Sequence, residues 1–330
     1  MRVRDAPIES ASERCAVRAP CFRPSRWARL GDPFFRALTV AGAGGVVVLT
    51  GWLVWEMYAN SAEARHAFGW KFLVSQEWDP VAGQFGALPF IFGTAVTGFV
   101  SLLMALPLGV GTAVFLAELA PRRVSSLLAF LIDLLAAVPS VIYGLLGIFL
   151  LVPFLSQTVV PILKRAFGFL PFLSGPFYGV SLLSACFVLA IMIVPFIVSI
   201  SREVLLTVPR EQRDAALALG ATKWEMVRGV VLPQAQRGIY GSAFLALARA
   251  LGETMAVTMV VGNDPRIVKS LLAPGYTIAA VIANEFTEAT GDLYLSALIE
   301  LGLVLFGITL LINGLARVLI LTITPKVRHE

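Results

Sequence analysis

The stretch PREQRDAALALGATKWEMVRGVVLP, residues 209–233, lies between two long apolar segments and predicts two short helices that meet at a glycine. Its opening proline is tolerated in a first helical turn, and Arg210 to Leu219 are mostly good helix formers. Gly220 supplies the positive φ that ends a helix at low cost. Thr222 and Glu225 have the spacing of a capping box, so a second helix should begin at once. The stretch therefore predicts a compact knob outside the membrane.

Small side chains in this knob favour docking onto a partner. Ala215, Ala216 and Ala218 leave room for close approach of another chain. The residues expected to carry the docking are Asp214, Ala215, Ala216, Gly220, Leu232 and Pro233. The alternative is that residues 201–237 form only a long, basic, solvated loop.

Composition places the chain among integral membrane proteins. It has 330 residues, of which 58% are hydrophobic and 14% charged, whereas soluble domains have about 25% charged residues. Crossing a hydrocarbon core of about 30 Å takes roughly 20 apolar residues in a helix. The six stretches that satisfy this requirement lie near residues 38–58, 90–118, 126–154, 179–200, 238–262 and 294–321. The predicted fold class is an all-α polytopic bundle of six transmembrane helices.

Basic residues orient the bundle. With the amino terminus inside, 19 lysines and arginines fall on the cytoplasmic side and six on the outer side. This bias predicts that both termini and the 201–237 loop are cytoplasmic. Because the net charge of +5 is explained by this bias, no nucleic-acid partner is expected.

The expected organisation is a membrane domain over residues 37–325, flanked by a tail and a short end. Residues 1–36 are rich in arginine and proline and are expected to be disordered, with membrane lipid as a contact. Residues 326–330 are expected to form a cytoplasmic C-terminus.

The spacing of cysteines and histidines predicts no metal site. Cys15, Cys21 and Cys186 have neither a zinc spacing nor a disulfide pattern, and His66 and His329 are isolated from other ligands. We expect no metal site and no catalytic residues.

A nucleotide site is also not expected in this chain. No lysine follows a Gly-x-x-x-x-Gly pattern, so the phosphate-binding loop of an ATPase is missing from the sequence. A membrane bundle with a docking knob and no cofactor of its own fits a complex in which a partner subunit uses ATP.

A second polar stretch, RALGETMAVT at residues 249–258, falls inside the predicted span 238–262. Arg249 and Glu253 are four residues apart, so they should share one helix face and pair. Thr254 and Thr258 add hydroxyl groups. A guanidinium beside a carboxylate suits a partly protonated oxyanion such as hydrogen phosphate, which makes these four residues the candidate substrate path. The alternative is an ion pair that only braces two helices.

Asp133 and Pro139 mark a weaker candidate in the predicted span 126–154. Proline lacks an N–H and clashes with the preceding turn, so the helix should bend or break near Pro139. Such a break would either line the path or only let helices cross.

Several motifs resemble those of the PstC family, the phosphate permeases of bacterial ABC importers. These motifs are RALGETMAVT at 249–258, WDP at 78–80, FGALP at 85–89, AVPSVIYG at 137–144 and ANEF at 283–286. The 209–233 stretch is similar to the docking loop of ABC importer permeases, with Asp214 in place of the usual glutamate and Val230 in place of isoleucine. The resemblance covers about residues 37–325.

The resemblance implies a MetI-like, type I permease bundle in the bacterial inner membrane that forms half of a phosphate translocation path. Its implied partners are a PstA-like permease, a PstB-like ATPase dimer, a PstS-like phosphate-binding protein and a PhoU-like regulator. Three alternatives stay open: a permease for another oxyanion such as sulfate or molybdate, a secondary transporter, and a sensory membrane protein. A requirement for an ATPase separates the importers from the other two.

Overall fold

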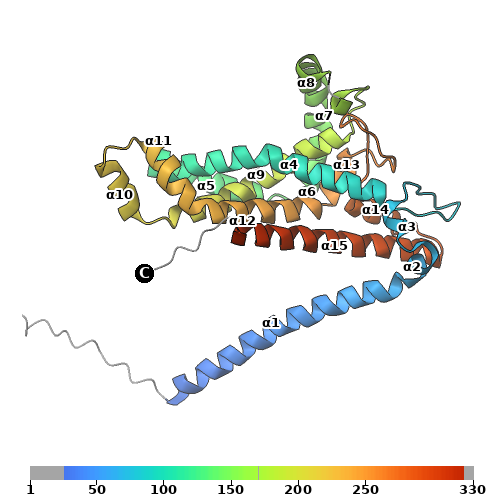
Figure 1. Ribbon diagram of the computed structural model, residues 1–330, viewed down its shortest axis with the longest axis horizontal. Coiled ribbons are helices and arrows are strands. Elements are labelled where there is room, and N and C mark those ends of the chain that lie inside the picture. Colours follow the sequence, from blue (N-terminus) through green and yellow to red (C-terminus); the bar gives the residue numbers. More distant parts are fainter. Residues whose placement is uncertain (1–25, 170, 323–330) are drawn as a thin grey trace, which may run out of the picture. The chain divides into compact units, whose positions relative to one another are not determined.

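The computed structural model describes residues 26–169 and 171–322, which form helices joined by irregular segments, with no β-strand among them (Figure 1). The chain divides into two compact units, residues 1–55 and 56–330. The first unit contains most of α1 (Arg26–Asn60). Within α1, the stretch Pro33–Asn60 is long and apolar enough to cross a membrane. The predicted all-α membrane fold is confirmed.

Helix α1 begins inside the segment that was expected to be disordered. Residues 26–36 are helical, whereas residues 1–25 lie outside the described part of the chain. Extending an existing helix costs less than nucleating one, so the apolar span propagates back toward Arg26. The predicted C-terminal segment 326–330 also lies outside the described residues.

Five helical stretches in the described ranges have the length and hydropathy of membrane spans. They are Pro33–Asn60, Leu88–Leu119, Ser140–Ala166, Leu182–Leu206 and Asp292–Ile320. The first, second, fourth and sixth predicted spans match members of this set. The other two, 126–154 and 238–262, are each interrupted.

The interruption in 126–154 lies at Pro139. Helix α5 (Arg122–Ala136) ends three residues before it, and α6 (Ser140–Leu146) begins directly after it. A residue that precedes proline is disfavoured in helical conformation, and proline offers no N–H to continue the ladder. The break expected near Pro139 is confirmed, but the third predicted span is wrong in its bounds. The helical run long enough to cross a membrane begins at Ser140.

Four π-turns widen the helices immediately before prolines. They are η1 (Phe115–Leu119), η2 (Gly147–Leu151), η3 (Leu155–Val159) and η5 (Val227–Val231). In each, the next residue donates its N–H to a carbonyl five positions earlier, and a proline follows: Pro121, Pro153, Pro161 or Pro233. Proline removes one donor and crowds the preceding turn, so a wider turn satisfies the remaining groups. Helix α7 (Val152–Phe154) lies between η2 and η3, and α8 (Val160–Phe167) follows η3.

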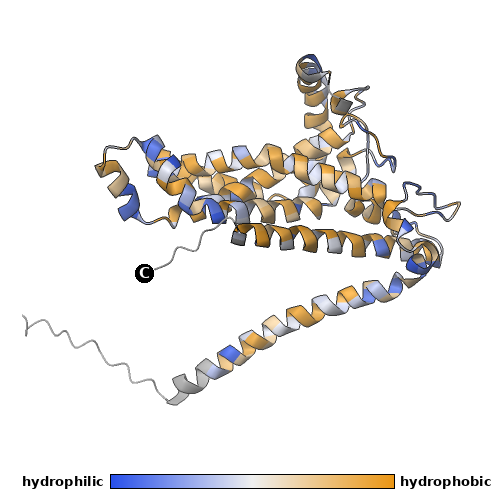
Figure 2. Ribbon diagram, viewed as in Figure 1, coloured by the Kyte–Doolittle hydropathy of each residue, from blue (hydrophilic) through white to orange (hydrophobic). Residues whose placement is uncertain are grey.

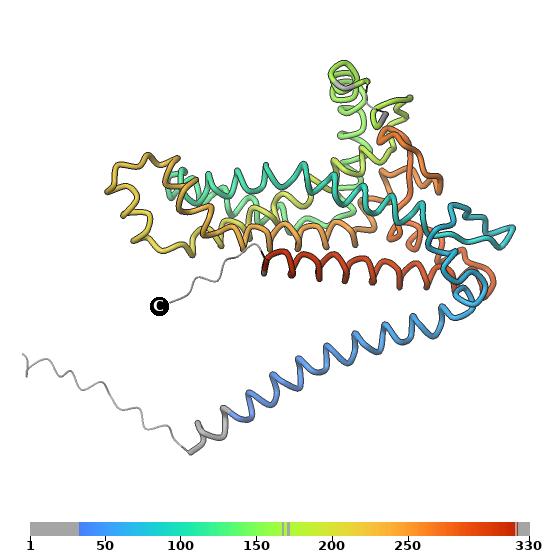
Figure 3. Tube along the Cα trace, viewed as in Figure 1, coloured from blue at the N-terminus to red at the C-terminus, as the bar shows by residue number. Residues whose placement is uncertain are grey.

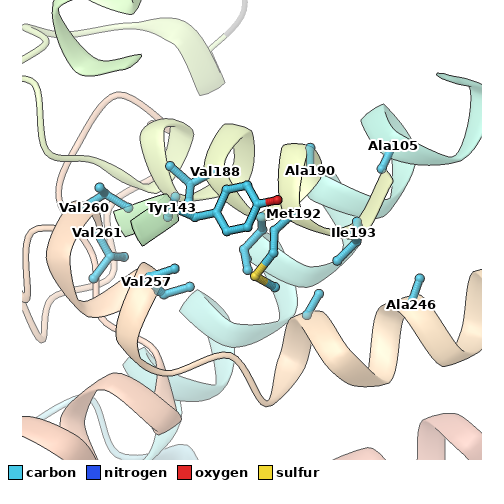
Figure 4. Close-up of a cluster of buried hydrophobic side chains, with 14 of the residues drawn as sticks. Ala105, Tyr143, Val188, Ala190, Met192, Ile193, Ala246, Val257, Val260 and Val261 are labelled. Carbon is cyan, nitrogen blue, oxygen red and sulfur yellow. The ribbon is translucent and has the colours of Figure 1, made fainter. Parts of the chain in front are cut away.

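The core of the second unit is formed where α4 (Leu88–Val114), α9 (Leu182–Leu206) and α12 (Leu232–Leu251) pack together (Figure 3). Figure 4 shows part of the buried cluster, in which Ile193 and Met192 of α9 lie near Ala246 of α12 and Ala105 of α4. Tyr143 of α6 and Val257 of α13 (Met255–Val260) extend this cluster. Small residues let these helices approach closely, as is usual in membrane bundles.

At one end of the bundle, α2 (Ala62–Phe68), α3 (Lys71–Val74), α14 (Ile278–Glu285) and α15 (Asp292–Thr322) surround an aromatic cluster. Glu285 accepts hydrogen bonds from Trp78 Nε1 at 2.8 Å and from the Tyr294 hydroxyl at 2.7 Å. This arrangement joins the WDP motif at 78–80 to the ANEF motif at 283–286. A short 3₁₀ turn, η4 (Pro171–Leu173), lies elsewhere in the connecting segments.

Candidate functional site

Helix α10 (Arg210–Ala218) forms the first half of the predicted knob. It ends in a Schellman motif, in which the Gly220 N–H donates to the Leu217 carbonyl at 3.0 Å and the Ala221 N–H donates to the Ala216 carbonyl at 3.2 Å. Gly220 has φ of 87°, the left-handed conformation that glycine adopts without a side-chain penalty. The expected positive φ at Gly220 is confirmed.

Helix α11 (Lys223–Met226) forms the second half and begins with the predicted capping box. The Glu225 N–H donates to Thr222 Oγ1 at 3.3 Å, and the Thr222 N–H donates to Glu225 Oε2 at 2.8 Å. The Thr222 N–H and the Thr222 hydroxyl both donate to the carboxylate, which favours its ionised form and lowers the pKa of Glu225. The turn between the two helices is therefore fixed by local hydrogen bonds on both sides of Gly220.

Large apolar side chains on this knob are exposed. Leu219 is 89% exposed and Trp224 is 62% exposed, and Asp214 and Ala215 are exposed beside them. Figures 1 and 2 show the α10–α11 pair projecting from one end of the helical bundle, with hydrophilic residues among the apolar ones. A protein contact surface commonly combines exposed apolar residues with a polar rim, and docking at this knob stays a prediction.

The other residues predicted for docking lie in two places. Ala216 is half-buried on the inner side of α10. Leu232 and Pro233 begin α12 at the base of the knob, where Leu232 packs against the buried cluster and Pro233 is exposed. The structure thus separates a tip around Gly220 from a base at Leu232 and Pro233.

Arg213 attaches the knob to the bundle through contacts that the sequence did not predict. Its Nη2 lies 2.8 Å from Glu118 Oε1, and its Nε lies 3.1 Å from the same oxygen. The guanidinium also donates to the carbonyls of Val208 and Leu205. The two side chains are only 14% and 7% exposed. A sequence separation of 95 residues leaves no local spacing from which this ion pair could be predicted.

The Arg249–Glu253 pair expected on one helix face is not formed. Helix α12 ends at Leu251, Gly252 turns, and α13 begins at Met255, so the continuous span 238–262 is also wrong. Glu253 Oε1 instead accepts from the Ala256 N–H at 3.3 Å, in the first turn of α13. The three ion pairs within the described ranges are Arg202–Glu203, Arg213–Glu118 and Arg266–Asp264. Because Gly252 favours a helix end, the carboxylate caps the next helix instead of meeting Arg249.

Arg249 remains on the last turn of α12, where its side chain is exposed in the single chain. Its guanidinium carbon lies 5.8 Å from the centre of the Phe196 ring, a cation–π arrangement. All five of its N–H donors lack a carboxylate partner within the described residues. The guanidinium is thus available to another group.

The two threonines of the candidate path satisfy backbone groups around the break. Thr258 Oγ1 donates to the Thr254 carbonyl at 2.7 Å, and Thr254 Oγ1 donates to the Gly252 carbonyl at 3.3 Å. Asn263, in the left-handed conformation at φ of 54°, donates to the Thr258 carbonyl. Irregular backbone inside a membrane is tolerated where it is buried in protein or lines a cavity. The structure therefore groups Arg249, Glu253, Thr254 and Thr258 around one helix break.

A family model described as "Binding-protein-dependent transport system inner membrane component" matches residues 105–329. The chain belongs to this inner-membrane transport family. The matched range begins in α4 and includes the whole knob and the helix break, so both candidate regions lie within the family's shared domain.

Named relatives of this family cover nearly the whole chain. The phosphate transport system permease protein PstC of Mesorhizobium japonicum is 48% identical over 316 residues, which is 93% of this chain and 97% of the relative. PstC of Haemophilus influenzae is 43% identical and covers 88% of this chain and 92% of its own length. A probable PstC of Methanocaldococcus jannaschii is 34% identical over 84% of this chain and 90% of the relative. The predicted resemblance to the PstC family is confirmed.

Solved structures in the inner-membrane transport class share the fold. A bacterial ABC transporter involved in alginate import superposes with a TM-score of 0.54 at 18% identity, covering 90% of this chain and all of the other. The inward-facing MetNI methionine ABC transporter gives a TM-score of 0.52 at 18% identity over 72% of this chain and 95% of the other. At this identity the likeness concerns the fold alone, and it confirms the predicted permease bundle.

Proposed function

We propose that the chain is the permease subunit of an ATP-driven phosphate importer, with both termini and the knob on the cytoplasmic side. The observation that carries this proposal is the 48% identity to a phosphate permease over 93% of the chain. The excess of basic residues in the segments around the knob supports the orientation. A PstA-like permease, a PstB-like ATPase dimer and a PstS-like binding protein would complete the complex.

Coupling to the ATPase would pass through the α10–α11 knob. Leu219 and Trp224 offer exposed apolar contact area, and Asp214 adds a charge at its side. The Arg213–Glu118 ion pair links α10 to η1, so a force on the tip would reach the bundle through this pair. ATP binding and hydrolysis by the partner would move this knob and alternate the access of the bundle.

Phosphate would pass Arg249 at the helix break. The guanidinium is a planar fork of donors that matches an oxyanion, and no carboxylate in the described chain occupies it. The Glu253 carboxylate, held by the Ala256 N–H, would accept a hydrogen bond from protonated phosphate. The Thr254 and Thr258 hydroxyls lie at the same break and would add weaker contacts.

The test is ATP-dependent uptake of labelled phosphate and labelled sulfate into vesicles that contain the chain, its partner subunits and the binding protein. Wild type is compared with Arg249→Gln, and with Arg165→Gln as a control at an exposed arginine outside both the break and the knob. We expect phosphate-selective uptake that falls at least tenfold in Arg249→Gln, with the complex still assembled. Removing a hydrogen bond to a charged group costs about 1.5–3 kcal/mol, which corresponds to roughly this loss or more.

Each outcome bears on a separate part of the proposal. Preference for sulfate would overturn the substrate and leave the permease architecture in place. Unchanged phosphate uptake in Arg249→Gln would remove Arg249 from the path. Uptake by the isolated chain under an ion gradient, without ATPase, would overturn the importer mechanism.

A further inference from the structure

A second basic site lies at the end of the bundle that carries the knob. A cleft of about 600 Å³ opens between η1, the start of α5, the end of α9 and the start of α10. Four arginines line it, together with two carboxylates: Arg122, Arg202, Arg210, Arg213, Glu118 and Asp214. The lining is therefore positive overall, and neither Arg122 nor Arg210 has a part in the proposed transport mechanism.

Two of the four guanidinium groups are already engaged in part. Arg213 is held by Glu118 and two backbone carbonyls, so it shapes the wall of the cleft. Arg202 contacts Glu203 through Nη1 at 3.0 Å, but its Nε is buried without a hydrogen-bond partner. A buried donor without a partner costs free energy, and an anion in the cleft would relieve that cost.

The other two guanidinium groups are unengaged. Neither Arg122 nor Arg210 has a hydrogen bond or an ion pair within the described parts of the chain. Arg122 is the first residue of α5, whose N-terminus has no side-chain cap and no acidic residue in its first turn. The partial positive charge of that helix end adds to the arginines. The cleft thus offers unpaired donors to a negatively charged group.

The cleft lies at the ends of two apolar spans, Leu88–Leu119 and Leu182–Leu206. Leu116 to Glu118 line it at the end of the first span, and Arg202 and Leu206 line it at the end of the second. Basic residues at this level, beside the ends of membrane helices, bind acidic phospholipids.

An exposed apolar strip continues from the cleft along α5. Arg122 and Ser126 line the cleft, and Phe130, 63% exposed, follows at the same four-residue spacing. Leu127 and Leu134 are exposed on the neighbouring positions of this strip. A basic cleft that leads into an apolar strip matches a ligand with an anionic head and a hydrocarbon tail.

We propose that this cleft binds the phosphodiester head group of an acidic phospholipid, with an acyl chain lying along Phe130 of α5. Arg122 and Arg210 would hold the phosphate oxygens, and Arg202 Nε would gain its missing acceptor. Such a lipid would connect α5 to the start of α10 without blocking the exposed tip at Leu219. The inference concerns lipid and does not depend on which substrate the chain transports.

The test measures lipid retention by the full-length chain purified with its partner subunits. The complex is titrated with phosphatidylglycerol or phosphatidylcholine, and bound lipids are counted by native mass spectrometry. The double variant Arg122→Gln/Arg210→Gln removes the two unengaged arginines of the cleft. Its matched control, Arg123→Gln/Arg228→Gln, removes the same charge from two exposed arginines that do not line it. All four side chains are exposed, so folding should be kept.

We expect wild type and the control to retain phosphatidylglycerol in preference to phosphatidylcholine. The cleft variant should bind phosphatidylglycerol roughly thirtyfold more weakly, because each basic residue near an anionic lipid contributes about a factor of five to six. Equal losses in the cleft variant and the control would show surface attraction only and overturn the proposal. Retention of phosphatidylcholine as strong as that of phosphatidylglycerol would also overturn it. Displacement of the lipid by inorganic phosphate at equal concentration would reassign the cleft to free phosphate.

Discussion

Arg213 determines how the knob is attached, because one guanidinium group bonds to a carboxylate and two carbonyls. The local pattern of residues 209–233 predicts the Gly220 turn and the Thr222–Glu225 capping box, and both are present. It does not predict the partner of Arg213, since Glu118 lies in another helix. Short-range hydrogen bonds follow from spacing in the sequence, whereas this contact depends on how η1 and α10 are placed by the fold. Arg249 and Glu253 have the predicted spacing but do not pair for a different reason, because the helix ends at Gly252 between them.

Glu118→Gln should destabilise the folded chain by about 3 kcal/mol, because it leaves the Arg213 charge buried without its counterion. The measurement is thermal or denaturant unfolding of the purified complex. Glu203→Gln is the control, since Glu203 also pairs with an arginine but is 70% exposed, and its loss should cost less than about 1 kcal/mol. Equal effects of the two substitutions would show that the Arg213–Glu118 pair does not hold the knob.

At the scale of the element, prolines and glycines determine where the helices change. Pro139 separates α5 from α6, and Gly252 separates α12 from α13. Apolar content alone places spans across both sites, so the predicted ranges 126–154 and 238–262 ignore breaks that the backbone imposes. The π-turns before Pro153, Pro161 and Pro233 keep the flanking helices continuous where a normal turn would lack a donor, whereas the one before Pro121 ends its helix at an extended Ala120. Hydropathy predicts a bundle of membrane spans, but not where Pro139 and Gly252 interrupt the helices.

Gly220→Val should weaken association with the ATPase, because a β-branched residue does not adopt φ of 87° without strain. No atom lies within 4 Å of a Cβ at this position, so the cost is conformational and not a clash. The strain should cost on the order of 1–3 kcal/mol. The amount of ATPase that co-purifies with the variant tests whether association is weakened.

Gly229→Val is the matched control for this substitution. Gly229 lies inside η5 with no positive φ and no neighbour within 4 Å of its Cβ. We expect this variant to retain more ATPase than Gly220→Val. If both bind the ATPase like wild type, the conformation of Gly220 has no part in docking.

For the whole molecule, close contacts among α4, α9 and α12 hold the bundle together. A Cβ on Gly238 of α12 would lie 2.3 Å from a Val204 methyl of α9, and a Cβ on Gly109 of α4 would lie 2.6 Å from an Ile197 methyl. The sequence predicts an all-α membrane bundle from composition and charge, but it does not say which glycines are contact points. Gly111 and Gly241 are equally small, yet nothing lies within 4 Å of their Cβ positions. Only the packed structure distinguishes the two kinds of glycine.

Gly238→Leu should therefore destabilise the bundle by about 1–3 kcal/mol or prevent its folding, since the added side chain overlaps Val204. Gly241→Leu, three residues along the same helix, should cost much less. Thermal unfolding of the two variants gives the comparison. A larger loss in Gly241→Leu would mean that α12 packs through its other face.

The unbroken helical run from Lys223 through η5 to Leu251 connects the knob to the break beside Arg249. Each residue of an α-helix turns the chain by about 100° and advances it by 1.5 Å. The angular phase between Trp224 and Arg249 is therefore fixed by the number of residues between them. Inserting one alanine after Leu245 would rotate Arg249 by about 100° relative to the docking surface. Uptake should then fail although both ends are chemically intact, whereas one alanine inserted after Lys269, in the 264–277 loop, would leave this phase unchanged.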